Sequence, residues 1–259
     1  MGERTEYAPG TFSWVDLSSS DQQASKAFYS ALFGWQAVDL PMDRGGHYSM
    51  MQIDGRNVAA ISSQPAQQAE AGVPSMWNSY VTVESADRAA ARATELGGNV
   101  HAGPFDVQQA GRMAVIQDPQ GGYVMAWEPR KNIGAGLVNA PGALVWNELQ
   151  SPDLDASASF YKDLFGWELA ELPGMEQRYM AIKVGERSNG GVTEASVPGA
   201  PAFWMAYFGV EDIEVGIAKV EELGGTKLAG PIDIKIAKLA VVKDPQGAFF
   251  ALYAGELEP

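Results

Sequence analysis

Two acidic residues, Asp16 and Glu148, occupy the same place in two matching stretches of sequence that lie 132 positions apart. Each follows a tryptophan by two residues, so the carboxyl group and the indole point to one face of an extended strand. A carboxyl group on a largely apolar face has a raised pKa and can act as a general base. The alternative, which we favour, is that both acids are solvated or paired with Arg112 and Lys238, which precede matching later strands.

The same strand faces carry many aromatic side chains. Apolar residues such as Val15 and Leu17 must pack against helices, so the alternate positions, which begin with Phe12 and Leu144, face the other side of each sheet. Flat aromatic surfaces suit a planar organic ligand, although they also suit a closed core. The candidate ligand-binding residues are Trp14, Asn78, Tyr80, Tyr123, Met125 and Trp127 in the first part of the chain, and Trp146, Met205, Tyr207, Phe249 and Tyr253 in the second.

Composition excludes several other functions. The chain has no cysteine, so disulfides, thiolate nucleophiles and cysteine metal sites are absent. Its two histidines, His47 and His101, follow glycine-rich stretches, and we expect both at the surface. A formal net charge of −14 disfavours nucleic acids and anionic membranes as partners. With no secretory signal pattern, and no apolar run near the roughly 20 residues of a membrane helix, we expect a cytoplasmic protein.

An internal repeat organises these residues. WVDLSSSDQQASKAFYSALFGW, beginning at Trp14, is echoed by WNELQSPDLDASASFYKDLFGW at Trp146, and DPQG occurs at both Asp118 and Asp244. The matches keep the same order in both halves, and each copy has the size of an ordinary domain. We therefore predict two related domains, 8–130 and 141–255, separated by a linker rich in glycine, asparagine and proline.

Within each half, a strand, a helix and three further strands are expected to occur twice. In the first half, Ser20 or Asp21 caps a helix that Gly34 ends. Its predicted apolar stripe comprises Ala24, Ala27, Phe28, Ala31 and Leu32. A second helix is predicted from Asp87 to Leu96, followed by strands that start with DVQQA at 106–110. The pattern predicts an α+β protein.

These motifs give the sequence a family resemblance. A strand followed by D-x-x-A-x-x-F-Y-x-x-L-F-G-W, and later a D-P-x-G hairpin before the last strand, resembles the vicinal oxygen chelate superfamily of glyoxalases, bleomycin resistance proteins and extradiol dioxygenases. The resemblance covers nearly the whole chain, twice. It implies tandem paired βαβββ units, each domain forming a curled mixed sheet around a cup with helices outside, while the reaction stays open.

The resemblance also implies where a divalent metal would bind. The superfamily's ligands are His, Gln or Glu in the first strand, His in the fifth and Glu in the last. The corresponding residues here are Trp14, Asn78 and Met125, and Trp146, Met205 and Ala251. None is a good ligand for such an ion, so no cofactor is expected. A displaced metal site, combining Asp16 or Glu148 with Glu194, remains an alternative, and the two acids are possible neighbours across the domains.

Three functions are consistent with these features. The first is a metal-free protein that binds a small planar or aromatic molecule in its cups. The second is a glyoxalase-like lyase, isomerase or dioxygenase-type enzyme that uses a non-standard metal site or the carboxyls of Asp16 and Glu148. The third is an interaction protein whose aromatic residues form only a core. We expect a monomer or homodimer, because fused halves can already make the pairing that single-domain relatives make as dimers.

Overall fold

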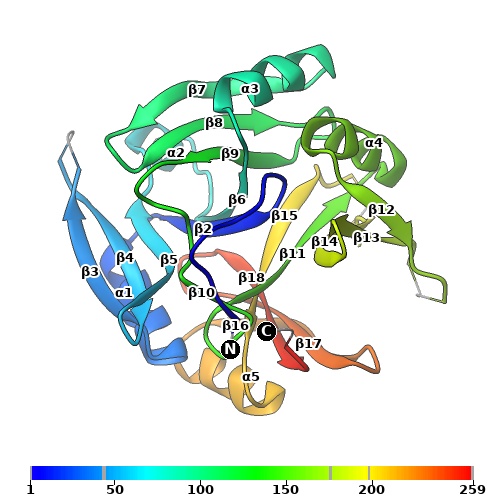
Figure 1. The fold of residues 1–259 in the computed structure, drawn as a ribbon. Coiled ribbons are helices and arrows are strands. Elements are labelled where there is room, and N and C mark those ends of the chain that lie inside the picture. The colour runs from blue at the N-terminus through cyan, green and yellow to red at the C-terminus, as the bar shows by residue number, and fades with distance from the viewer. Residues whose placement is uncertain (1, 43–44, 175–176, 198, 258–259) are drawn as a thin grey trace.

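The protein forms two eight-stranded sheets, one from each half of the chain (Figure 1). The computed structural model describes residues 2–42, 45–174, 177–197 and 199–257. The first half contains β2 (Phe12–Ser19), α1 (Gln22–Phe33), β3 (Gln36–Pro41), β4 (His47–Ile53), β5 (Arg56–Ser63), α2 (Ala66–Glu70), β6 (Met76–Thr82), α3 (Ala86–Glu95), β7 (Asn99–Val107), β8 (Gly111–Gln117) and β9 (Tyr123–Pro129).

The second half repeats this order, apart from the short helix α2. It contains β11 (Leu144–Ser151), α4 (Leu154–Phe165), β12 (Glu168–Glu171), β13 (Tyr179–Val184), β14 (Arg187–Glu194), β15 (Phe203–Gly209), α5 (Ile213–Glu222), β16 (Thr226–Asp233), β17 (Ala237–Lys243) and β18 (Phe249–Gly255). A small ribbon of β1 (Gly2–Glu3) and β10 (Leu137–Val138) joins the start of the chain to the linker. None of the helices among the described residues is long and apolar enough to cross a membrane.

The sheet topology confirms the predicted fold class. The strand orders are β3-β4-β5-β2-β6-β9-β8-β7 and β12-β13-β14-β11-β15-β18-β17-β16, so each sheet consists of two βαβββ units joined along their first strands. Both sheets are mixed: β2 pairs parallel with β5 and antiparallel with β6. The predicted tandem α+β architecture is thus confirmed.

The helices start and stop where capping residues predict, but α1 buries a partly different face. Asp21 accepts a hydrogen bond from the Ala24 backbone, and Gly34 ends the helix in the left-handed conformation that glycine favours. Its buried residues are Ser25, Phe28 and Tyr29, whereas Ala27 and Ala31 of the predicted stripe are exposed. The predicted stripe is confirmed at Phe28 and Leu32, which pack into the core. It is wrong at Ala27 and Ala31, because polar Ser25 and Tyr29 find hydrogen-bond partners in the interior.

The strand predicted at 106–110 was also misplaced. The observed strand β7 begins at Asn99 and ends at Val107, so it includes His101. Gln108 has a positive φ of 47°, and the backbone N–H of Ala110 donates to the Val107 carbonyl at 2.9 Å. This tight turn leads directly into β8, which explains why the chain leaves the sheet there.

The helix-bearing faces of the two sheets pack against each other. One core joins α1 and its strands to α5 of the second half, and another joins α3 and its strands to α4. Figure 1 accordingly shows the two sheets in separate parts of the molecule with helices between and outside them. The opposite, cup-forming faces have cores of their own, one for each half.

The predicted cup-facing positions of Phe12 and Leu144 are wrong. The register shifts at the start of β2 and at the start of β11 turn both side chains away from the cups. Phe12 pairs with Val81, but Trp14 already pairs with Tyr80, so one extra residue lies between them. Phe12 therefore turns away from the cup and packs on Trp204 of the second half, with ring centroids 4.9 Å apart. The matching irregularity moves Leu144 into the core between the halves.

Candidate functional site

The first cup is built around the carboxyl group of Asp16. Asn78 of β6 donates its amide to Oδ1 at 2.8 Å, while Tyr80 and Tyr48 donate their hydroxyls to Oδ2 at 2.8 and 3.0 Å. The indole N–H of Trp14 donates to the Tyr48 hydroxyl at 2.9 Å, which fixes the direction of that phenol. Neutral donors thus surround a side chain that is only 6% exposed.

The second cup repeats this arrangement with a longer acid. Glu148 accepts hydrogen bonds from Tyr207, Gln150 and Tyr179, and the indole N–H of Trp146 donates to the Tyr179 hydroxyl at 2.8 Å. Each cup therefore contains one buried carboxyl group, two tyrosines and a tryptophan that orients one of them. The difference lies in the amide, which comes from the neighbouring strand in the first cup and from the acid's own strand in the second.

Burial determines the protonation of these acids. Loss of water raises the pKa of Asp16, and the hydrogen bonds from Asn78, Tyr80 and Tyr48 only partly offset that rise. Burial likewise raises the pKa of Glu148 above its ordinary value, against the opposing effect of its donors. A raised pKa brings a carboxyl group closer to the pH range in which a general acid or base works.

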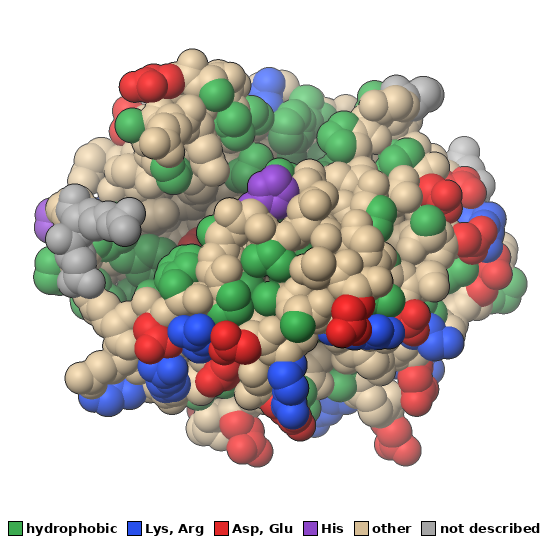
Figure 2. Space-filling view, turned by 90° about the horizontal axis from the view of Figure 1, so that it is seen from above, with side chains coloured by type: hydrophobic (Ala, Val, Ile, Leu, Met, Phe, Trp, Pro, Cys, Tyr) green, Lys and Arg blue, Asp and Glu red, His purple; other side chains and the backbone are tan. Residues whose placement is uncertain are grey.

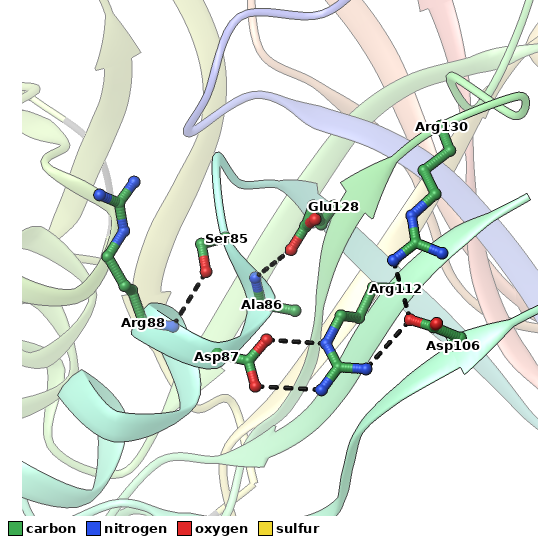
Figure 3. Close-up of polar contacts among 8 residues, drawn as sticks. All are labelled: Ser85, Ala86, Asp87, Arg88, Asp106, Arg112, Glu128 and Arg130. Carbon is green, nitrogen blue, oxygen red and sulfur yellow. Dashed lines mark hydrogen bonds and ion pairs between the residues drawn. The ribbon is translucent and has the colours of Figure 1, made fainter.

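The predicted pairing of these acids with basic residues is wrong. Arg112 instead donates to both carboxylate oxygens of Asp87, at 2.7 and 3.0 Å, and to Asp106 at 3.0 Å. Figure 3 shows this surface cluster, in which Arg130 also reaches Asp106. Lys238 is exposed and Glu148 is buried among tyrosines. Arg112 lies on the same face of β8 as the buried Ala114 and Ile116, which pack against α3, so its side chain points to the helix and away from the cup.

Asp16 and Glu148 lie in separate cups. The hydroxyl of Ser79, next to Asn78, donates to Asn147 of β11 at 2.7 Å, so the two sheets meet back to back at this point. Successive side chains of a strand point to opposite faces. Asn78, the neighbour of Ser79, and Glu148, the neighbour of Asn147, therefore point away from each other. The two acids therefore do not form one site. Glu194 is exposed and pairs in β14 with Ser151, three residues beyond Glu148, so it does not join that acid.

The remaining candidate residues divide into a buried floor and an exposed rim. The first floor contains Trp14, Tyr80, Met125 and Trp127, and the second contains Met205 and Tyr207, flanked by half-buried Trp146 and Tyr253. Asn78 is half-buried beside Asp16. Tyr123 and Phe249 lie at the rims, 38% and 47% exposed. The face of the molecule drawn in Figure 2 has a hollow in its left part, with hydrophobic side chains in its walls.

Sequence reasoning missed Tyr48 and Tyr179. They occupy equivalent positions in β4 and β13, directly after His47 and Arg178, and this repeated tyrosine was the available signal. The stretch HYSMMQI around Tyr48 does not alternate clearly between polar and apolar residues, so its inward face does not show in the sequence. His47 and His101 are both exposed, as expected.

The comparison with known protein families gives this architecture a name. The model of the Glyoxalase/Bleomycin resistance protein/Dioxygenase superfamily matches residues 11–125 and again residues 143–252. The chain belongs to this superfamily. Over 255 residues it is 40% identical to "Putative glyoxylase CFP32" of Mycobacterium tuberculosis, with 97% of each chain covered. It is 32% identical to "Anthracycline biosynthesis protein DnrV" of Streptomyces peucetius, covering 96% of this chain and 94% of that protein.

Solved structures of the superfamily share the fold at low sequence identity. The Mn(II)-bound glyoxalase from Novosphingobium aromaticivorans superposes with a TM-score of 0.68 at 14% identity, covering 96% of this chain and 83% of that one. The 2,3-dioxygenase LapB from Pseudomonas sp. KL28 gives 0.67 at 13% identity, covering 100% and 95%. At such identities the likeness establishes the glyoxalase- and dioxygenase-like fold alone.

The residues around Asp16 do not fit the divalent metal that the superfamily implies. Three hydrogen-bond donors already point at its two oxygens. Trp14 and Met125 in the same cup offer an indole and a thioether, whereas such ions require several oxygen or imidazole ligands. Within the described parts of the chain, no three His, Cys, Asp or Glu side chains come together to hold a metal ion.

Proposed function

We propose that this protein binds a small planar aromatic molecule in its aromatic cups, through stacking and hydrogen bonds and without a metal ion. The observation that carries the proposal is the buried carboxyl group held by two tyrosines on an aromatic floor. Aromatic walls favour flat ligands, and a few fixed polar groups orient them. The two binding units would be residues 8–130 and 141–255.

Exposed apolar side chains around the first cup support this proposal. Val38 and Leu40 of β3 pair with Met50 and Tyr48, and Phe105 of β7 pairs with Met113, so they share the cup face. These three side chains are between 42% and 45% exposed. An aromatic floor beneath exposed apolar walls is what a ligand would cover, whereas a closed core needs no such walls.

The names of two relatives agree with a planar ligand. They are anthracycline biosynthesis proteins from Streptomyces, about 30% identical to this chain. Anthracyclines are polycyclic aromatic compounds, so this resemblance supports a flat ring system as the ligand.

Binding can be tested with the intact protein and a panel of planar aromatic compounds, each matched by a saturated analogue of similar size. We expect aromatic members to quench tryptophan fluorescence, because Trp14, Trp127 and Trp146 lie in the cups, and to raise the melting temperature. Saturated analogues should do neither. If no aromatic compound changes either signal, the proposal is wrong.

A second candidate function is a glyoxalase-like lyase, isomerase or dioxygenase-type enzyme. The raised pKa values of Asp16 and Glu148 favour it, since both carboxyl groups are suited to proton transfer. For any activity identified, Asp16→Asn and Glu148→Gln should each be compared with the parent protein. Unchanged turnover in both variants would remove these two acids from the mechanism.

A further inference from the structure

A row of polar side chains crosses one half of the first cup. In the pairing of β2 with β6, Asp16 lies opposite Asn78, and in that of β9 with β8, Tyr123 lies opposite Gln117. β6 and β9 are parallel neighbours whose register brings these two pairs side by side on the cup face. The row therefore begins at the buried carboxyl group and runs outward across four strands.

His101 extends this row to the edge strand β7. Its Nε2 lies 2.8 Å from the side-chain oxygen of Gln117, and its ring centroid is 5.0 Å from that of Tyr123. The imidazole is exposed. We call Asp16, Asn78, Tyr123, Gln117 and His101 the polar row. It offers hydrogen-bond donors and acceptors from the floor of the cup to its rim.

The second cup lacks the polar row. Its equivalent positions hold Glu148, Met205, Phe249, Lys243 and Leu228. The carboxyl group is retained, but a methionine and a phenylalanine follow it and a leucine replaces the histidine at the edge. The repeat has therefore kept the buried acid in both cups and the hydrogen-bonding row in only one.

The other half of the first cup is apolar at the same level. On that side Asp16 pairs with Ala60, which pairs with Met50, which in turn pairs with Val38. A flat molecule lying across this cup would have one edge against polar groups and the other against apolar ones. Its polar edge would face a carboxyl group, an amide, a phenol and an imidazole.

We propose that the first cup is the tighter ligand site and that it selects an uncharged polycyclic aromatic molecule with hydroxyl or carbonyl groups along one edge. This inference rests on the proposed function and adds the choice of cup and the class of ligand. Anions are disfavoured by the buried acid and by the net charge of −14. Hydroxyl groups on the ligand's polar edge can donate to the side-chain oxygen of Asn78, whose amide N–H is held by Asp16, and carbonyl groups can accept from the outer part of the row.

Two probes separate the polar row from simple stacking: 1,8-dihydroxyanthraquinone, whose two hydroxyl groups flank one carbonyl on a single edge, and unsubstituted anthraquinone. Titration of the intact protein by fluorescence and calorimetry should give one tight site per chain for the dihydroxy compound, with about fivefold or more preference over anthraquinone. His101→Leu, which copies the second cup, should remove much of this preference and leave anthraquinone binding unchanged. Equal affinity for both compounds would overturn the role of the polar row.

A matched pair of variants identifies the cup. Phe105 and Ile232 occupy equivalent places in β7 and β16, are 42% and 46% exposed, and face the cups opposite Met113 and Leu239. Phe105→Ala should weaken binding of the dihydroxy compound about tenfold, whereas Ile232→Ala should change it less than about twofold. The reverse pattern would overturn the choice of cup while leaving the proposed function intact. If neither compound binds while another member of the aromatic panel does, this inference fails and the proposed function stands; if no member of the panel binds, both fail.

Discussion

The hydroxyl of Tyr29 in the first half donates a 2.9 Å hydrogen bond to Oδ2 of Asp244 in the second half. Tyr29 belongs to the FYxxLFGW motif and Asp244 to the DPQG turn, so the two motifs that mark the repeat meet across the domain boundary. The other oxygen of Asp244 accepts from the backbone of Gln246 and Ala248, which shapes the turn. Tyr29 also accepts from the indole N–H of Trp77 at 3.0 Å.

Removing this hydroxyl should weaken the connection between the halves. Tyr29→Phe leaves a buried carboxylate oxygen and a buried indole N–H without their partner, so we expect the free energy of unfolding to fall by about 1–3 kcal/mol. Urea denaturation measures the change. Tyr123→Phe, at an exposed position, is the control and should alter stability by less than about 0.5 kcal/mol. A Tyr29→Phe protein as stable as the parent would show that this bond contributes little.

The raised pKa of Asp16 predicts a specific pH dependence of stability. Folding raises this pKa above the ordinary value of 3.8, so the folded state binds the proton more readily than the unfolded state. The stabilisation is therefore complete below the unfolded pKa and is lost as pH rises through the folded pKa. Relative to the parent, Asp16→Asn should become more stable as pH rises from about 4 through the folded-state pKa of Asp16.

Urea denaturation of both proteins at a series of pH values tests this difference, and comparing the two cancels the other buried acids. Arg112→Gln serves as the control, because Arg112 pairs with Asp87 and Asp106 and leaves Asp16 untouched. Relative to the parent, the free energy of unfolding of Arg112→Gln should not rise with pH as that of Asp16→Asn does. If Asp16→Asn instead loses stability relative to the parent as pH rises, the pKa of Asp16 is lowered by folding.

Gly191 provides room for the tyrosine that contacts Glu148. A Cβ atom at this position would lie well inside contact distance of the Tyr179 ring and hydroxyl. Gly191→Ala should therefore push the phenol away from Glu148 and Trp146 and lower the free energy of unfolding by about 1–3 kcal/mol. The first cup has Ala60 opposite its acid, so Ala60→Gly is the matched variant and should leave the Trp14 to Tyr48 hydrogen bond in place.

Tryptophan fluorescence and urea denaturation distinguish these results. The loss of the hydrogen bond from Trp146 to Tyr179 should change the emission of Gly191→Ala. An unchanged spectrum and unchanged stability would mean that the tyrosine tolerates the methyl group without moving.

The fold could be read from the sequence because its main signals are local or repeated. Asp21 and Gly34 cap a helix through contacts within a few residues, and the FYxxLFGW and DPQG repeats fixed the two-domain order. Alternation placed Trp14, Asp16 and Tyr80 on one face of their strands. Such patterns depend on the period of a strand or helix and need no knowledge of distant contacts.

The errors arose where a distant partner decides the outcome. Phe12 turns away from the cup because of one extra residue in the strand, and its new partner, Trp204, comes from the other half. Tyr29 is buried because its hydroxyl donates a hydrogen bond to Asp244, which lies 215 residues further along the chain. Periodicity cannot reveal such pairings, since each depends on how separate elements are packed.

The hydrogen bonds to Asp16 also predict how the protein responds to metal ions. Tyr80, Tyr48 and Asn78 occupy the directions from which an ion would approach this carboxylate, so binding would cost the hydrogen bonds they make. We expect plasma mass spectrometry of untagged protein, purified without chelator and then incubated with iron, nickel, manganese or zinc, to find far less than one ion per chain. The melting temperature should likewise stay constant when each metal is added. About one tightly held ion per chain, lost in Asp16→Asn, would contradict the metal-free proposal and favour the enzyme, whereas loss in Glu148→Gln would assign the ion to the second cup.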